Sequence, residues 1–402
     1  GFNLGDTMET ARNRYQVSKA PVQPGVYRKI SGNEALVYGL VTASKKANRE
    51  LLYSGYPITP ASPVLEGLSQ LKNFGIKCVQ AEDEIAAMGV ALGASFAGDL
   101  TVCATSGPGM CLKSEFIGLA SITELPLIIC NVQRGGPSTG LPTKTEQSDL
   151  LQALFSRHGD CPIPVIAAHS PSDCFDCAIE AVRIALTYMT PVILLSDLYV
   201  ANGAEPWRVP NVSDIPVIEN SFAKTEEEYV IYRRDPKTLA RMQAIPGQVG
   251  LEHRIGGLEK GEDGGVSYDP DNHEEMSHLR AQKVAGIAKS LDPIEIQGEP
   301  EGDLLVIGWG GTYGAISSAA TNLRDEGFSV SNIHLRHLNP LPDDLGDIIG
   351  RFKKVIVPEL NLGQLNLLLR AKYLVDVISY GKLQGKPFKV SELHEKFLEH
   401  LR

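Results

Sequence analysis

The stretch YPITP at positions 56–60 combines two prolines with two side chains that can donate hydrogen bonds. Pro57 and Pro60 fix their own backbone angle and turn Tyr56 and Thr59 away from helical geometry. A phenol and a hydroxyl are therefore held on a stiff loop, which suits a binding loop at the end of a strand. A proline turn whose only role is to end the strand accounts for the same pattern.

Three consecutive acids, Glu82, Asp83 and Glu84, open a segment with a helical pattern. Apolar residues recur along it and predict a buried stripe made of Ile85, Met88, Leu92 and Phe96. Gly89 and Gly93 each cost about 1 kcal/mol inside a helix compared with alanine. Such glycines favour the close approach of another backbone or of a flat ligand, and a carboxylate beside that surface can share a proton with a ligand nitrogen. The helix dipole alone also explains the acids, because carboxylates stabilise a first turn.

The segment ATSGPG at 104–109 lies between a predicted strand and a predicted helix. Its free N–H groups at the helix start can face an anion or a heterocycle. It lacks the Gly-Lys-Ser/Thr ending of a P-loop. A plain turn explains the segment equally well.

Arg134 follows a predicted strand and opens the loop RGGPSTGLPTKTEQSDL. A guanidinium group is planar and always charged, so it binds carboxylates through two hydrogen bonds. Loops at the carboxyl ends of strands in α/β sheets are where ligands bind. Thr139, Thr143 and Lys144 are further donors in the same loop. We interpret the loop as a candidate carboxylate clamp, although a surface loop needs none of these residues.

Three other patterns fall short of a metal or nucleotide site. Cys174 and Cys177 form a single CxxC in a helical context, which favours helix packing over a zinc or iron–sulfur site. His273 and His278 are five residues apart and do not share one helical face. The glycine-rich segment at 308–314 has imperfect spacing for a dinucleotide site and no acid about 20 residues on. We predict no metal bound by this chain alone.

The scaffold for these turns is an alternation of strand-like and helix-like segments from about 33 to 203. The alternation predicts an α/β fold, a parallel sheet covered by helices. Periodicity is lost between about 204 and 300, apart from a helix near HEEMSHLRAQKVAGIAKSL. A second alternation starts at 301, with SVSNIHLRHL among its predicted strands. We divide the chain into an N-terminal arm or linker (1–32), a first α/β domain (33–205), a connecting region (206–300) and a smaller second α/β domain (301–402).

The 402-residue chain has 38 basic and 48 acidic side chains, a net charge of −10. No basic stripe suggests a nucleic-acid partner, and no apolar run approaches the roughly 18 residues that cross a bilayer. Seven cysteines, mostly in apolar segments, favour a reducing compartment, and we expect the cytoplasm. The first residue is Gly rather than Met, so we expect this start to be trimmed or to lie within a longer polypeptide.

The ordered motifs YPITP, EDEIAAMGVALGAS, ATSGPG and NVQRGGPSTGLPT resemble those of 2-oxoacid:ferredoxin oxidoreductase α subunits, most closely the 2-oxoglutarate (KorA-type) branch. The resemblance covers about residues 33–400 and implies a thiamine diphosphate-binding fold, with a pyrimidine-binding first domain and a transketolase C-terminal-like second domain. It implies that Glu84, preferred over Glu82, hydrogen-bonds the pyrimidine N1′ of thiamine diphosphate. It implies further cofactor contacts at Tyr56, Pro57, Ser106 and Gly107, and 2-oxoacid contacts at Thr59, Arg134, Thr143 and Lys144.

The family's diphosphate motif and cluster-binding cysteines are missing from this sequence. The resemblance places both on a β subunit, which would supply Mg²⁺ and a [4Fe-4S] cluster and complete the active site. It also implies coenzyme A, ferredoxin and a γ-type domain that is separate or fused. The expected reaction is the reversible oxidative decarboxylation of 2-oxoglutarate to succinyl-CoA. Alternatives are the same chemistry on pyruvate or a broad range of 2-oxoacids, a self-sufficient thiamine enzyme, and a noncatalytic scaffold subunit.

Overall fold

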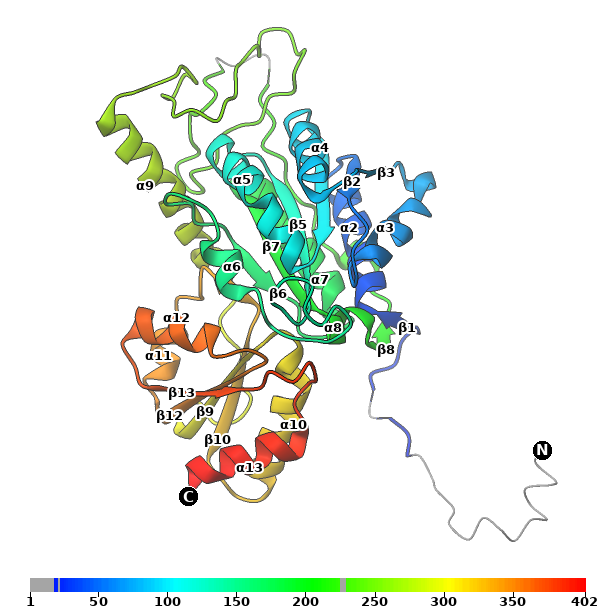
Figure 1. Ribbon diagram of the computed structural model, residues 1–402, viewed down its shortest axis with the longest axis vertical. Coiled ribbons are helices and arrows are strands. Elements are labelled where there is room, and N and C mark those ends of the chain that lie inside the picture. Colours follow the sequence, from blue (N-terminus) through cyan, green and yellow to red (C-terminus); the bar gives the residue numbers. More distant parts are fainter. Residues whose placement is uncertain (1–17, 21, 225–228) are drawn as a thin grey trace, which may run out of the picture.

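The structure is a computed structural model that describes residues 18–20, 22–224 and 229–402. Most of the predicted N-terminal arm lies outside these residues. Figure 1 shows two α/β units joined by a long irregular segment. The described strands form a seven-stranded sheet, a four-stranded sheet and a two-stranded ribbon. The α/β class predicted from the alternation is confirmed.

The larger sheet has the strand order β11-β6-β7-β5-β4-β2-β3. Its strands are β2 (Leu51–Gly55), β3 (Lys77–Gln80), β4 (Leu100–Thr105), β5 (Leu127–Gln133), β6 (Val165–Ala167), β7 (Pro191–Asp197) and β11 (His337–Asn339). Its neighbouring strands are parallel except for β11 with β6. Strands β4, β5 and β7 are buried throughout, as expected for parallel strands covered on both faces. The carboxyl ends of β2, β4 and β5 therefore meet at one edge, where the predicted binding loops begin.

Helices cover both faces of this sheet (Figure 1). One face carries α2 (Gly32–Lys46), α3 (Ser62–Ser69), α7 (Asp173–Tyr188) and α8 (Leu198–Asn202), with the short η1 (Lys72–Phe74) after α3. The other face carries α4 (Glu84–Phe96), α5 (Gly107–Thr123) and α6 (Leu150–Phe155). Side chains of β5 alternate between the two cores, Cys130 on the first face and Ile129 on the second, which is the period of a strand.

The segment between the two units runs along the edge of the first unit. It starts after an antiparallel ribbon of β1 (Tyr27–Ser31) and β8 (Ala204–Arg208). It contains η2 (Val212–Asp214), α9 (Pro270–Gly286) and η3 (Ile287–Ser290). The helix predicted near the end of this region is confirmed as α9. Asp269 caps it by accepting hydrogen bonds from the N–H groups of its first turn.

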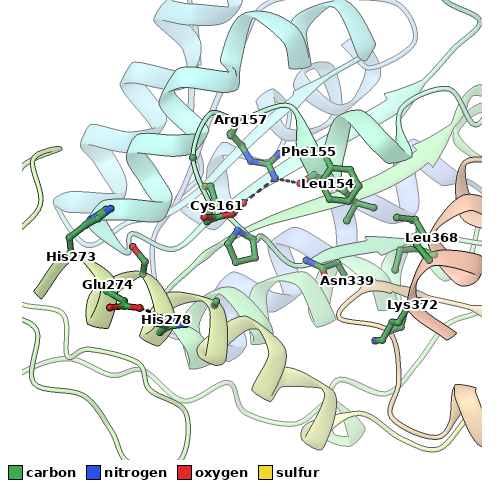
Figure 2. A pocket seen from close by; sticks show the side chains of 18 residues that line it. Leu154, Phe155, Arg157, Cys161, His273, Glu274, His278, Asn339, Leu368 and Lys372 are labelled. Carbon is green, nitrogen blue, oxygen red and sulfur yellow. Dashed lines mark hydrogen bonds and ion pairs between the residues drawn. The ribbon is translucent and has the colours of Figure 1, made fainter. Parts of the chain in front are cut away.

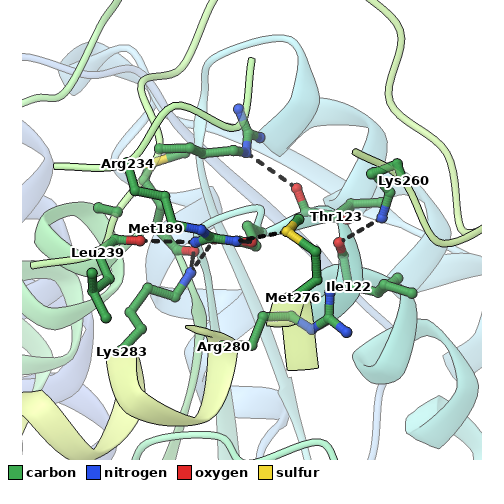
Figure 3. A network of polar contacts seen from close by, with 12 residues as sticks. Ile122, Thr123, Met189, Arg234, Leu239, Lys260, Met276, Arg280 and Lys283 are labelled. Carbon is green, nitrogen blue, oxygen red and sulfur yellow. Dashed lines mark hydrogen bonds and ion pairs between the residues drawn. The ribbon is translucent and has the colours of Figure 1, made fainter. Parts of the chain in front are cut away.

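Buried charges dock this segment on the carboxyl end of α5 (Figure 3). The Glu124 carboxylate, with no exposed surface, accepts from Arg234 Nη2 at 2.6 Å and from Lys283 Nζ at 2.5 Å. Lys260 Nζ donates to the carbonyl of Ile122 at 3.0 Å. Burial alone would raise the pKa of Glu124, but Lys283 and Arg234 outweigh it and lower this pKa to about 2. The segment is therefore held by a buried ion cluster in which both Glu124 oxygens are paired.

The smaller sheet is parallel, with the order β10-β9-β12-β13. Its strands are β9 (Gly302–Trp309), β10 (Val330–Leu335), β12 (Phe352–Glu359) and β13 (Val377–Gly381). Its helical elements are η4 (Gly310–Thr312), α10 (Tyr313–Asp325), α11 (Leu345–Ile349), α12 (Gln364–Tyr373) and α13 (Val390–Leu401).

The single strand predicted at SVSNIHLRHL is wrong, because the structure divides it between the two sheets. Residues 330–335 form β10 in the smaller sheet, whereas His337–Asn339 form β11 at the edge of the larger one. The chain changes sheet at Arg336, whose carbonyl accepts from Ala167 N and whose guanidinium pairs with Asp173 of α7. A continuous apolar pattern predicts strand geometry but not the sheet to which the strand belongs.

The two units also meet along the loop after β5. Gln147 Nε2 donates to the carbonyl of Trp309 at 2.7 Å, and Gln147 Oε1 accepts from Leu360 N at 2.8 Å. The glycines before α10 permit this close packing, since a Cβ at Gly310 would stand 3.0 Å from Gln147 Nε2 and one at Gly311 would stand 2.5 Å from the Asp197 carboxylate. The glycine-rich segment at 308–314 therefore serves packing between the units.

Candidate active site

Glu84 is the first residue of α4 and lies at the edge where β4 ends. Asp83 caps the helix by accepting from Ala86 N at 2.8 Å. Glu84 is 8% exposed, whereas Glu82 is exposed. A Cβ at Gly109 would stand 2.9 Å from Glu84 Cγ and 3.2 Å from Oε1. The missing side chain at Gly109 thus makes room for the Glu84 carboxyl group.

The stripe that α4 buries differs from the predicted one at its two ends, since Ile85 is exposed and Phe96 is only half-buried. Its buried residues are Glu84, Ala87, Met88, Ala91, Leu92 and Ser95. Ile85 is 43% exposed. It follows the buried Glu84 in the helix and therefore projects from a different side of α4. A Cβ at Gly89 would meet the ring of Phe116 on α5 at 3.3 Å, whereas one at Gly93 would meet nothing within 4 Å. One glycine therefore serves packing between α4 and α5, and the other faces open space.

Ser106 precedes α5 and has a hydroxyl group that is buried without a hydrogen-bond partner among the described residues. The next residue, Gly107, lies against Asp149, since a Cβ there would stand 3.0 Å from both carboxylate oxygens. Buried hydroxyls normally find a partner. Ser106 therefore points to a group that is supplied from outside the described chain.

Arg134 and Thr59 come from different loops and meet. Arg134 Nη1 donates to the Thr59 carbonyl at 2.5 Å, and the arginine is 7% exposed. Its Nε has no partner among the described residues. The Thr59 side chain is itself exposed. A guanidinium held in this way retains donors for a planar anion.

The remaining predicted residues lie on exposed loops. Tyr56 is 40% exposed, and Pro57 and Thr143 are also exposed. Lys144 lies in the Arg134 loop, where its carbonyl accepts from Gly135 N at 3.0 Å. Its side chain packs against Gly385 of the second unit, where a Cβ would approach within 2.7 Å of Lys144 Cβ. The structure thus brings Lys144 into the Arg134 turn.

Two buried charged residues near the site were missed by the sequence reasoning. The Asp149 carboxylate accepts from Asn131 Nδ2 at 2.9 Å and lies between Gly107 and the Arg134 turn. Burial raises its pKa, against the lowering effects of Asn131, Ser148 and Arg134. Lys113 of α5 has no exposed surface. The only sequence signal for it is a lysine within a largely apolar helix.

The site has the groups for two kinds of recognition. A buried carboxylate and an unpaired hydroxyl at a helix start can hold a heterocycle that shares a proton. The guanidinium on the neighbouring strand end can hold a carboxylate. The strand order places β4 next to β5, so both ligand parts would lie over the same sheet edge.

Two cavities lie elsewhere. The larger, about 950 Å³, lies between α6, α9 and α12 and is lined by Phe155, His273, His278 and Lys372 among others (Figure 2). A second of about 500 Å³ lies between the units near His169 and His334. Glu84, Ser106 and Arg134 line neither.

The cysteine and histidine pairs that fall short of a metal site both lie on helices. Cys174 and Cys177 are buried free thiols in α7, and His273 and His278 lie on α9. In the described part of the chain, no cluster of three or more His, Cys, Asp or Glu side chains could hold a metal. None of its helices is long and apolar enough to span a membrane.

A protein-family model described as "Pyruvate flavodoxin/ferredoxin oxidoreductase, thiamine diP-bdg" matches residues 43–265. A Mycobacterium tuberculosis protein called 2-oxoglutarate oxidoreductase subunit KorA is 53% identical over 98% of this chain. The chain spans 60% of that relative's length. A 2-oxoglutarate synthase subunit KorA of Archaeoglobus fulgidus is 36% identical over 83% of this chain and 88% of its own length.

Among solved structures, the 2-oxoglutarate:ferredoxin oxidoreductase from Magnetococcus marinus matches with a TM-score of 0.93 and 35% identity. The match covers 100% of this chain and 69% of the other. That structure has 2-oxoglutarate, coenzyme A and succinyl-CoA bound. The fold and the motif-bearing region are thus shared with the same group of proteins.

Proposed function

Because the chain belongs to the KorA-type 2-oxoacid:ferredoxin oxidoreductase α subunits, we propose that it forms half of the active site of such an enzyme. The chain has the thiamine diphosphate-binding fold of this family, followed by a transketolase C-terminal-like α/β unit. The proposed reaction converts 2-oxoglutarate and coenzyme A to succinyl-CoA and carbon dioxide, reversibly. Two electrons pass singly to ferredoxin.

The observation that carries the proposal is the polar group formed by Glu84, Gly109 and Ser106 at the edge of the larger sheet. Glu84 offers a buried carboxylate that no hydrogen bond or ion pair occupies within the described residues. Gly109 leaves room beside it, and the Ser106 hydroxyl lacks a partner. These groups fit the polar edge of an aminopyrimidine ring. When bound, thiamine diphosphate would supply the electron sink that decarboxylation of a 2-oxoacid needs.

The chain's own residues then have distinct roles. Glu84 holds a proton at the pyrimidine N1′, while Tyr56, Pro57, Ser106 and Gly107 border the cofactor. Arg134 and Thr59 hold the carboxylate next to the 2-oxo group, a role that suits a charged, planar guanidinium at a strand end. Thr143 and Lys144, in the same turn, suit the second carboxylate of 2-oxoglutarate. Pyruvate or a broad range of 2-oxoacids is the alternative substrate class.

The proposed β subunit completes the site with the Mg²⁺–diphosphate motif and a [4Fe-4S] cluster. Support comes from α4 and α5, on which the apolar residues Ile85, Val90 and Leu112 are 43%, 38% and 50% exposed. Large apolar side chains exposed on the two helices that border the site favour a partner chain. The greater length of the Mycobacterium tuberculosis relative accommodates a further domain, and we propose a γ-type domain, separate or fused, in the assembly.

Domain roles and compartment follow from the same proposal. We assign residues 33–205 to the pyrimidine-binding domain, 206–300 to the connecting region and 301–402 to the second domain, after an arm at 1–32. We place the enzyme in the cytoplasm, because its seven cysteines are free thiols, and free thiols are typical of a reducing compartment.

The test is Glu84→Gln in the complex that co-purifies with the chain, with Glu82→Gln as the matched control. Glu84→Gln should lower 2-oxoglutarate-dependent ferredoxin reduction by about 100-fold or more, since proton-transfer groups contribute roughly 10²–10⁴-fold. Glu82→Gln should leave the rate unchanged, and both complexes should elute intact from a sizing column. A Glu84→Gln complex with wild-type turnover would favour the scaffold alternative.

A further inference from the structure

Lys113 is a charged residue in a place where packing alone favours an apolar one. It lies on α5 with no exposed surface, on the same helix as the buried Met110 and Ile117. A lysine is almost never fully buried unless it is paired, because removing an ammonium group from water is costly. A leucine or methionine would fill the same space without that cost.

The partner of Lys113 is the main chain of Glu84. Lys113 Nζ donates to the Glu84 carbonyl at 2.8 Å, a contact between α5 and the first residue of α4. The ammonium group thus lies near the start of α4, where the helix dipole is already positive. The contact ties α5 to the start of α4 and places a positive charge next to the residue that carries the candidate carboxylate.

The ionisable groups around Lys113 come from two elements. Asp83 and Glu84 belong to α4, and Cys103 belongs to β4. Burial lowers the pKa of Lys113, whereas Cys103, Glu84 and Asp83 raise it. The Cys103 thiol donates to the Ala87 carbonyl at 3.6 Å, and burial raises its pKa to about 11. The two carboxylates of α4 are therefore the counter-charges of Lys113.

We propose that Lys113 is a positioning residue for Glu84: it fixes the Glu84 main chain through its carbonyl and keeps a positive charge beneath the carboxylate. This inference rests on the proposed function. Glu84 is one of the carboxylates that raise the pKa of Lys113, so the two opposite charges attract each other. Together with the space left at Gly109, this attraction and the hydrogen bond to the main chain hold the Glu84 side chain in place for the pyrimidine N1′.

The test compares Lys113→Met with Lys260→Met in the intact complex. Lys260 is a matched control, because it is also buried and also donates to a main-chain carbonyl, that of Ile122 at the other end of α5. The readouts are thiamine diphosphate affinity by calorimetry, the near-ultraviolet circular dichroism band of the imino tautomer across pH, thermal unfolding, and the separate values of kcat and KM.

Lys113→Met should weaken the imino band, move its pH midpoint and lower kcat by about tenfold, equivalent to about 1.4 kcal/mol. The KM for the 2-oxoacid should change by less than about twofold, since substrate contacts are untouched. Lys113→Arg should restore most of the band, because it keeps the charge. Lys260→Met should lower only the unfolding temperature.

Equal losses of unfolding temperature in Lys113→Met and Lys260→Met, with a wild-type band and kcat in both, would overturn the inference. Should Lys113→Met assemble poorly, Lys113→Arg and Lys113→Gln give the same comparison of the band. Glu84→Gln separates a failure of the positioning role of Lys113 from a failure of the proposed function. If it abolishes turnover while Lys113→Met does not, only the positioning role fails; if Glu84→Gln is fully active, the proposed function fails.

Discussion

The two ends of α5 both bury charges, but they treat them differently. At the carboxyl end, Glu124 is paired with Arg234 and Lys283, and the main-chain carbonyl of Ile122 receives Lys260. At the amino end, the Ser106 hydroxyl is buried without a partner within the described residues, and the one hydrogen bond that Glu84 accepts there goes to its carbonyl rather than to its carboxylate. The buried acid is thus paired at one end of α5 and left for another group at the other end.

This difference separates a structural role from a binding role. A buried polar group without a partner is costly, because it has lost its hydrogen bonds to water. At the carboxyl end, groups from the connecting segment remove that cost for the Glu124 carboxylate. The amino end leaves the cost in place, which is expected where a ligand or a partner chain provides the missing contacts. The comparison predicts that mutations at the first end change stability and those at the second change activity.

Removal of the Glu124 side chain should have the largest effect on stability. Glu124→Ala leaves Arg234 and Lys283 buried without a counter-charge, and breaking such a cluster costs about 3–5 kcal/mol. Glu84→Ala should cost less than about 1 kcal/mol, because its carboxylate has no partner to lose. Urea unfolding of the purified chain measures both. Equal losses would show that the two ends are not distinct.

Acid should weaken the same cluster. The pKa of Glu124 is lowered in the folded state from its ordinary 4.5 to about 2, so the stabilisation is complete above pH 4.5 and is lost as the pH falls through 2. The shift corresponds to about 3 kcal/mol. The unfolding free energy of the wild type should therefore fall relative to that of Glu124→Gln between pH 4.5 and 2. Parallel pH profiles for the two proteins would contradict the pairing.

The sequence predicts the framework of the site better than its details. Alternating segments predict the parallel sheet, and the loops after β2, β4 and β5 are found at one edge because parallel strands must end there. The sequence does not predict that β11 joins the larger sheet, since the spacing of apolar residues indicates a strand but not the strand with which it pairs. Lys113 and Asp149 were missed for a related reason: a lysine in a helix and an acid before one are ordinarily solvated, and only tertiary contacts bury these two.

Arg134 should affect substrate binding rather than stability. Arg134→Ala removes a charged donor to the 2-oxoacid carboxylate, and hydrogen bonds to charged groups contribute about 1.5–3 kcal/mol. We expect the KM for the 2-oxoacid to rise about 10- to 100-fold, and the KM for coenzyme A to stay within about twofold. Arg134→Lys should give an intermediate KM for the 2-oxoacid, because lysine keeps the charge but lacks the planar group that donates two parallel hydrogen bonds. A parallel rise in both KM values would argue against the clamp.

The smallest effect is expected at Gly93. A substitution there also tests whether this face of α4 binds the proposed β subunit. A Cβ there would meet nothing within 4 Å, and Gly93 lies inside α4, so Gly93→Ala should stabilise the isolated chain by about 1 kcal/mol. Gly89→Ala is the matched control and should gain less, because its Cβ would press on Phe116 at 3.3 Å. If this face of α4 receives the proposed β subunit, the added methyl group should weaken assembly, measured as the dissociation constant of the complex, while the chain alone becomes more stable. A gain in stability with unchanged assembly would mean that the partner contacts the site from another side.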